Sequence, residues 1–404
     1  MTQSEIISQT EQYVLHTYNR FPVALDRGNG MRVWDTEGRS YLDFMSGIGV
    51  YALGYHYPGY DEALTAQLQK TLHTSNLYYH EPLAEAARKL VTSAGLDKVF
   101  FTNSGAEAIE GAIKAARKYS FAKYGPGRSG IIAMNDSFHG RTVGAVSVTG
   151  NEHYQEPFRP LMQGVSFAAY NSISGVRELL SDQTCAVILE TLQGEGGIFP
   201  AEEACLKELR ALCTERDIVL ILDEVQCGMG RTGHMWAYEA YGIKPDILCC
   251  AKALGCGVPV GAFVLSEKIS SSSLAAGDHG STYGGNPFVT AAVSTVFDLF
   301  ESGGIVRHVR DTAPYLEEQL DRLKDSYGFI TEHRGAGFMR GLELDPSVPA
   351  GKVAARALEK GLLIITAGHN VLRFLPPLIA GKDEIDEAAG ILAACFDEAA
   401  EGNL

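Results

Sequence analysis

The sequence predicts an α/β fold in which a mostly parallel central sheet is flanked by helices and a smaller α+β domain is attached. Helical and strand patterns alternate from about residue 60 to residue 265, as they do where helices connect parallel strands. Two runs rich in branched apolar residues, 219–222 and 246–250, are typical of buried central strands. With 404 residues, 46% of them hydrophobic, the chain can bury a core large enough for such a fold.

The individual elements follow in chain order. Residues 31–44 predict two short strands around the turn Asp35-Thr36-Glu37-Gly38. Residues 82–94 and 106–124 have helical periodicity, and each precedes a strand pattern, at 98–102 and 130–134. Later patterns predict helices over 287–301 and about 313–325, then the segment 338–344, another helix and a strand over 371–374. We expect residues 1–60 to be an N-terminal segment that joins the small domain, 61–300 the large cofactor-binding domain and 301–404 the C-terminal small domain.

Charge and cysteine usage restrict the function classes. The formal net charge of −15, without a basic run, disfavours binding to nucleic acid or to an anionic membrane. No stretch approaches the roughly 20 apolar residues of a membrane span, and residues 1–12 lack a basic segment followed by an apolar one. The eight cysteines form no CxxC pair and mostly lie in apolar runs, as buried thiols in a reducing compartment do. We therefore expect a cytoplasmic protein.

An acid and an amine follow the two apolar runs. Asp223 falls at the carboxyl end of the first, where open α/β sheets place their ligands, and it could keep a pyridinium nitrogen protonated. Lys252 follows the second run on a loop, where it could carry a cofactor as a Schiff base. The pair predicts a pyridoxal phosphate enzyme. No metal is expected, because His73 with His80, or Asp136 with His139, does not make a convergent ligand set.

Three polar segments could complete a cofactor site. The segment 101–108 passes from a strand through a polar turn into a helix, which leaves two interpretations open: a phosphate site at the helix end, or a plain cap by Ser104. In 137–141, Phe138 could stack on a cofactor ring while Arg141 binds a carboxylate, although a core phenylalanine and a surface arginine are the alternatives. The loop 281–286 could give hydroxyl and amide donors to phosphate, and by itself it would be only a turn.

Taken in order, the segments 103–108, 137–141, 223–226, 251–253 and 281–286 resemble the class III aminotransferases. The likeness runs from about Tyr18 to the C-terminus and includes Thr366 to Leu378. It implies the aspartate aminotransferase-like fold, fold type I, and pyridoxal 5'-phosphate bound to Lys252. By this resemblance Asp223 pairs with the pyridine nitrogen, Gln226 lies near the ring hydroxyl and Phe138 stacks on the ring. The expected cofactor contacts further include Ser104, Gly105, Ala106, Glu224 and Val225, together with Thr282.

The resemblance also implies roles for substrate-binding residues. Arg373 would bind the α-carboxylate of 2-oxoglutarate, and Arg141 would bind its distal carboxylate or the carboxylate of the amine donor. Glu195 would pair with Arg373 while the amine donor is bound, and Ser281 would touch substrate. Thr282 would reach the phosphate of the neighbouring subunit, which implies a homodimer. Thr191 departs from the family, because many relatives have proline there, and this puts the path of the Glu195 loop in question.

The expected reaction transfers the terminal amino group of N2-acetyl-L-ornithine to 2-oxoglutarate, in arginine biosynthesis. Ile48 stands where ornithine-specific relatives carry a tyrosine that can meet a free α-amino group, so an acylated nitrogen is favoured. Succinylornithine, ornithine and 4-aminobutyrate remain alternative donors. An aminomutase or racemase on the same fold, which would need no external keto acid, and a non-catalytic metabolite-binding protein are alternatives from other classes.

Overall fold

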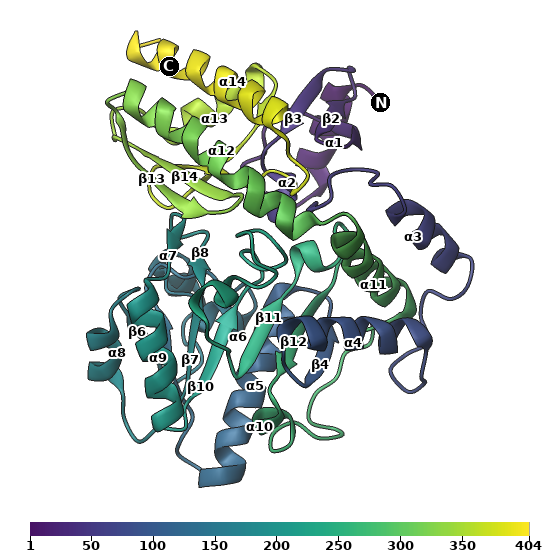
Figure 1. The fold of residues 1–404 in the computed structure, drawn as a ribbon, viewed down its shortest axis with the longest axis vertical. Helices are drawn as coiled ribbons and strands as arrows, with labels where there is room; N and C mark the ends of the chain where they lie inside the picture. The colour runs from purple at the N-terminus through teal and green to yellow at the C-terminus, as the bar shows by residue number, and fades with distance from the viewer. Residues whose placement is uncertain (404) are drawn as a thin grey trace.

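The computed structural model describes residues 1–403, and its centre is a seven-stranded sheet (Figure 1). The strand order is β4 (Lys98–Thr102), β12 (Gly261–Leu265), β11 (Ile247–Cys250), β10 (Val219–Asp223), β7 (Thr184–Glu190), β5 (Gly130–Met134) and β6 (Val165–Ala168). Six of the strands run in one direction, and β12 alone runs in the opposite direction. The predicted, mostly parallel sheet is confirmed.

Apolar side chains on both faces of β10 hold this sheet between two helical layers. Leu220 and Leu222 belong to one core cluster, and Val219 and Ile221 belong to another on the opposite face. Alternate residues of a strand point to opposite faces, so a strand buried on both faces is apolar throughout. Helix α5 (Gly105–Tyr124) packs against β11 and β12, while α9 (Glu203–Glu215) packs near β10 on the other face.

A second, four-stranded antiparallel sheet lies in the C-terminal part. Its order is β13 (Ile330–Ala336), β14 (Met339–Leu344), β17 (Val371–Phe374) and β16 (Ile365–Ala367). Helices α12 (Ile305–Ser326), α13 (Ala350–Glu359) and α14 (Lys382–Ala400) accompany it, and Figure 1 shows them above the central sheet.

The N-terminal strands join this C-terminal part through one short parallel pairing. Strands β1 (Leu25–Asn29), β2 (Arg32–Asp35) and β3 (Ser40–Asp43) form a sheet that β15 (Leu362–Leu363) completes. In Figure 1 the purple N-terminal strands accordingly lie beside the yellow C-terminal helix. The pairing supports an N-terminal segment that joins the small domain, and the boundaries at residues 60 and 300 stay a prediction.

Helix α12 is longer than its sequence pattern indicates. The prediction began at about residue 313, next to Pro314, whereas the helix begins at Ile305 and contains that proline. Proline lacks a backbone donor and normally disturbs a helix interior. Here the buried residues Val309, Leu316 and Leu320 lie on both sides of Pro314, so packing of one apolar face maintains the helix through it.

The other elements are shorter or lie at the edges. The helices α1 (Gln3–Tyr13), α3 (Tyr60–Leu68), α4 (Glu81–Ala94), α8 (Ile173–Leu179) and α11 (Pro287–Ser302) accompany short helical segments α2 (Ser46–Gly49), α6 (Val143–Ser147), α7 (Glu152–Gln155) and α10 (Glu267–Ser270), the turns η1 (Glu156–Phe158), η2 (Ala237–Tyr241) and η3 (Lys252–Leu254), and the hairpin β8 (Leu192–Gln193) with β9 (Phe199–Pro200). The eight cysteines are free thiols, and seven of them are buried. Within residues 1–403 no single helix has the length and apolar character to cross a membrane, and the bent pair α11 and α12 meets that test by length and composition only.

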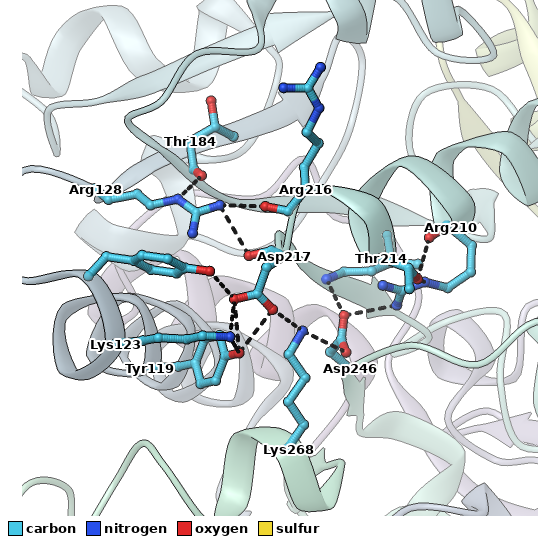
Figure 2. Close-up of polar contacts among 12 residues, drawn as sticks. Tyr119, Lys123, Arg128, Thr184, Arg210, Thr214, Arg216, Asp217, Asp246 and Lys268 are labelled. Atoms are coloured by element: carbon cyan, nitrogen blue, oxygen red, sulfur yellow. Dashed lines mark hydrogen bonds and ion pairs between the residues drawn. The ribbon is translucent and has the colours of Figure 1, made fainter.

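Asp217 organises a polar cluster at the amino-terminal end of β10 (Figure 2). Its carboxylate accepts hydrogen bonds from Tyr119, Lys123 and Tyr124 of α5, and Lys268 of α10 lies 2.8 Å away. These cations lower the pKa of Asp217, although its partial burial acts in the opposite direction. The cluster ties α5 and α10 to the edge of the sheet that lies opposite the ligand-binding edge.

Candidate active site

A cavity of about 490 Å³ opens where β7, β10 and β11 end. This is the carboxyl edge of the parallel strands, where α/β proteins bind ligands. The structure brings ten of the residues singled out from the sequence to the cavity wall. These ten are Ser104, Gly105, Ala106, Phe138, Arg141, Glu195, Asp223, Val225, Gln226 and Lys252.

Asp223 ends strand β10 with a buried carboxylate that is held in place from two sides. Its Oδ2 lies 2.7 Å from His139 Nδ1, and its Oδ1 accepts a hydrogen bond of 3.0 Å from the amide of Val225. His139 is itself only 3% exposed, and its Nε2 has no hydrogen-bond partner among the described residues. Sequence reasoning considered His139 only as a metal ligand and missed this contact.

Lys252 follows strand β11 with a backbone φ of 50°. Such left-handed geometry costs a non-glycine residue about 1–3 kcal/mol, and it persists where surrounding contacts enforce it, often in active sites. Burial lowers the pKa of Lys252 to about 8, with Glu195 opposing this shift and Arg373 adding to it. Roughly a tenth of the amine is therefore neutral at pH 7, far more than for a lysine with the ordinary pKa of 10.5.

The amino end of α5 forms a close-packed cradle beside the cavity. Ser104 caps the helix by accepting a hydrogen bond of 3.2 Å from the amide of Glu107. The first amides of a helix have no intrahelical acceptor, so those of Gly105 and Ala106 can bind an anion. A Cβ on Gly105 would lie 2.9 Å from Val225 Cγ1, so glycine permits the approach of these two segments. The cap and the anion site are thus compatible.

Arg141 reaches the cavity from a loop and stacks on an aromatic side chain. Its guanidinium carbon lies 3.8 Å from the ring centroid of Tyr154 and 5.4 Å from that of Phe138. The two rings are themselves perpendicular, with centroids 6.0 Å apart. Arg141 makes no ion pair among residues 1–403, so its charge is available to an anionic ligand. Tyr154 was not recognised from the sequence, where nothing relates it to Arg141.

Glu195, on the cavity wall, forms a two-contact ion pair with Arg373. Arg373 Nη1 lies 2.6 Å from Glu195 Oε1, and Nη2 lies 3.2 Å from Oε2. Arg373 is 3% exposed and also donates a hydrogen bond of 3.3 Å from Nη1 to Gln226 Oε1. Burial tends to raise the pKa of Glu195, but the charge and hydrogen bonds of Arg373 outweigh it and lower that pKa. With threonine at position 191, Glu195 still reaches Arg373. The buried Thr191 hydroxyl donates a hydrogen bond of 2.8 Å to Glu224.

Four of the expected residues are not part of the cavity wall: Arg373, which contacts the wall residues Glu195 and Gln226, and also Glu224, Ser281 and Thr282. The Glu224 carboxylate is buried and accepts hydrogen bonds from Thr191 and from the amides of Ala237 and Tyr238. Thr282 is exposed, and Ser281 is half-buried with its hydroxyl 3.1 Å from Asn103 Nδ2. A cofactor contact of Glu224 through its side chain would therefore require these three hydrogen bonds to break.

The comparisons with known proteins cover nearly the whole chain. The sequence matches the family Aminotransferase class-III over residues 13–396. It is 46% identical to the acetylornithine aminotransferase of Caldanaerobacter subterraneus subsp. tengcongensis, covering 97% of this chain and 99% of the relative, and 46% identical to that of Methanocaldococcus jannaschii, covering 98% and 99%. Among solved structures, the ornithine aminotransferase of Toxoplasma gondii gives a TM-score of 0.95 at 30% identity, covering 100% of this chain and 96% of that one. The acetylornithine aminotransferase of Elizabethkingia anophelis gives 0.88 at 30% identity, covering 98% and 100%.

Proposed function

The chain belongs to the class III aminotransferases, and from this premise we propose that it transfers the terminal amino group of N2-acetyl-L-ornithine to 2-oxoglutarate. The products would be N-acetyl-L-glutamate 5-semialdehyde and L-glutamate, and the reaction would serve arginine biosynthesis in the cytoplasm. One observation supports two-substrate transamination above all others. Arg141, which has no ion pair among residues 1–403, lines one cavity with Lys252 and Glu195, and Glu195 pairs with a second arginine, Arg373.

The cavity fits pyridoxal 5'-phosphate, which the family binds through a lysine Schiff base. Asp223 offers a buried carboxylate to the ring nitrogen, and the packed cradle at Gly105 and Ala106 offers amides to the phosphate. Phe138 and Gln226 line the same cavity as candidates for contact with the ring and its hydroxyl. When bound, the cofactor supplies an electron sink that makes a substrate carbon acidic.

We assign proton movement to Lys252. An amine acts as a base only in its neutral form, and burial beside Arg373 lowers the pKa of Lys252 to about 8. Asp223 is held in place for the ring nitrogen by His139 and the amide of Val225, which contact its two oxygens. Neither role requires a metal.

The arginines allow one cavity to accept two substrates of different charge. While the amine donor is bound, Glu195 neutralises Arg373, and Arg141 binds the donor carboxylate. When 2-oxoglutarate enters, Glu195 moves off Arg373, so that both arginines meet carboxylates. The Arg373–Glu195 contacts of 2.6 and 3.2 Å correspond to the masked state.

The preference for an acylated donor rests on Ile48. This side chain is 38% exposed and lies in the segment Gly47 to Gly49, where all three residues have positive φ. The Cβ position of Gly49 is 3.9 Å from Gln226, which places the segment beside the cavity. An aliphatic residue leaves a charged α-amino group without a hydrogen-bond acceptor, so free ornithine is disfavoured.

A homodimer would complete the phosphate site through Thr282. The loop of Thr282 is fixed to residue 76, because Asn76 Nδ2 donates hydrogen bonds of 2.9 Å to the carbonyls of Ser281 and Gly284. Next to Asn76, the side chains of Leu77, Tyr78 and Tyr79 are 85%, 70% and 104% exposed. Such contiguous apolar exposure marks an interaction surface. We propose that a second copy covers it.

Product analysis tests the proposed donor. The purified protein, supplied with pyridoxal phosphate and 2-oxoglutarate, is given acetylornithine, succinylornithine, ornithine or 4-aminobutyrate in separate reactions, and glutamate is measured by mass spectrometry. Acetylornithine should be the best donor, and the Ile48→Tyr variant should gain activity with ornithine. A single substrate that reacts without 2-oxoglutarate would indicate a mutase or racemase, and best activity with another amine would overturn the donor assignment.

A further inference from the structure

Glu190 connects two loops that carry different parts of the site. It ends strand β7 and is paired in register with Asp223 at the end of β10, so the two carboxylates lie side by side at the cavity. Glu190 Oε1 accepts a hydrogen bond of 2.9 Å from the amide of Phe138, and Oε2 accepts another of 2.9 Å from the amide of Gly194. The side chain is buried, with 6% of Glu190 exposed.

The two amides belong to segments with separate tasks. Phe138 lies in the loop that presents its ring and His139 to the cofactor cavity, whereas Gly194 immediately precedes Glu195. A Cβ on Gly194 would lie 2.5 Å from Gln226 Oε1, so only glycine permits this close approach of the Glu195 loop to Gln226. The Glu190 carboxylate therefore fixes the origin of the Glu195 side chain.

We propose that Glu190 is a positioning residue that holds the Phe138 loop and the Glu195 loop at a fixed separation and thereby places Glu195 on Arg373. The proposal rests on the proposed function and names a residue that acts through two others. A second tie between the loops, from Gln193 Nε2 to the carbonyl of Asn135 at 2.9 Å, keeps them adjacent when Glu190 is changed. Loss of the carboxylate should thus alter placement without separating the loops.

Burial also raises the pKa of Glu190 to about 7, with the charge of His139 opposing the shift and that of Asp223 adding to it. A protonated carboxyl oxygen is a poorer hydrogen-bond acceptor, so protonation of Glu190 would weaken one of the two amide contacts. In this respect Glu190 differs from Glu195, whose pKa Arg373 lowers.

The Glu190→Gln variant separates positioning from a general structural role. Glutamine keeps the size of the side chain, but the two amides meet different oxygens of Glu190, so in the variant one of them faces an NH2 group and loses its acceptor. In single-turnover kinetics, kcat/KM with acetylornithine should fall about tenfold more than kcat/KM with 2-oxoglutarate, because only the amine half-reaction needs Glu195 on Arg373. The Glu190→Asp variant, which keeps the charge but shortens the reach, should not restore the ratio.

A matched control and a measurement on cofactor-free protein accompany the kinetics. Asp35 is another buried carboxylate that accepts two backbone amides, from Glu37 and Arg39, and it lies outside the cavity. Hydrogen exchange at the amides of Phe138 and Gly194 should be slow in the wild type, faster in Glu190→Gln and unchanged in Asp35→Asn. Equal losses in both half-reactions, or amides that already exchange rapidly in the wild type, would overturn the proposal. A wild type that transaminates no donor would refute the proposed function, and the exchange measurement would still decide whether Glu190 holds both loops.

Discussion

Replacing Glu195 by glutamine removes the carboxylate that neutralises the charge of Arg373. Removing one member of a buried ion pair costs about 3–5 kcal/mol. Two features make the energetic cost smaller here. The Glu195 side chain is 29% exposed, and glutamine can still accept one of the two hydrogen bonds of 2.6 and 3.2 Å. We take about 2 kcal/mol as the loss in the state that binds the amine donor, which corresponds to about 30-fold in kcat/KM.

Rapid-mixing absorbance measurements resolve the two half-reactions of the Glu195→Gln variant. The amine half-reaction should slow about 30-fold in kcat/KM, whereas the reaction with 2-oxoglutarate, which requires an unmasked Arg373, should change less than about threefold. Glu317→Gln is the matched control, because Glu317 pairs with buried Arg340 at 2.8 Å outside the cavity. Equal losses in both half-reactions, or a larger loss with 2-oxoglutarate, would refute the masking role.

Four further predictions concern the site and the stability of the large sheet. Arg373→Lys loses the bidentate fork, so the KM for 2-oxoglutarate should rise about tenfold in single-turnover assays while the amine half-reaction changes little. Lys252→Ala should keep the circular dichroism spectrum of the folded protein and lose multiple turnover. Because the pKa of Lys252 is lowered to about 8, uptake of pyridoxal phosphate by cofactor-free protein should accelerate with pH and level off above about 8, and a rate still rising near the ordinary value of 10.5 would contradict this. Asp217→Asn, at a φ of 51° that asparagine tolerates, should lower the free energy of unfolding by about 1–2 kcal/mol near neutral pH in urea titrations. The lowered pKa of Asp217 means that the wild type keeps this contribution above the ordinary value of 3.8 and loses it as pH falls toward the folded-state pKa, so a variant with the same acid profile as the wild type would be evidence against the cluster.

The large sheet could be predicted because its local signals agree with its tertiary role. The strand of Val219 to Asp223 is apolar on both faces, which is the requirement of a central parallel strand, and its acid falls at the ligand edge. Strand β4 was predicted with the bounds that the structure has. The fold class, the family and the cofactor chemistry are confirmed by the comparisons.

The parts that sequence reasoning missed depend on contacts between distant segments. Strand β15 contains two residues and forms by pairing with β3, some 320 positions earlier, so no periodic signal marks it. The ion pair of Arg373 with Glu195 spans 178 positions, and it was anticipated from family resemblance and not from spacing. His139 and Glu190 acquire their roles from buried partners on neighbouring strands and loops. The available signal was their position, since Glu190 ends strand β7 and His139 lies in the loop after β5, and polar residues there lie at the ligand edge.

The most direct test of transamination at Lys252 is the visible absorbance of the protein loaded with pyridoxal phosphate. Acetylornithine should remove the band of the lysine-bound cofactor without any other substrate, and 2-oxoglutarate should then restore it, with one glutamate formed per site. A band that does not respond to acetylornithine, or that needs both substrates together before it changes, would contradict the two-step mechanism in which Lys252 and the Arg373–Glu195 pair act in turn.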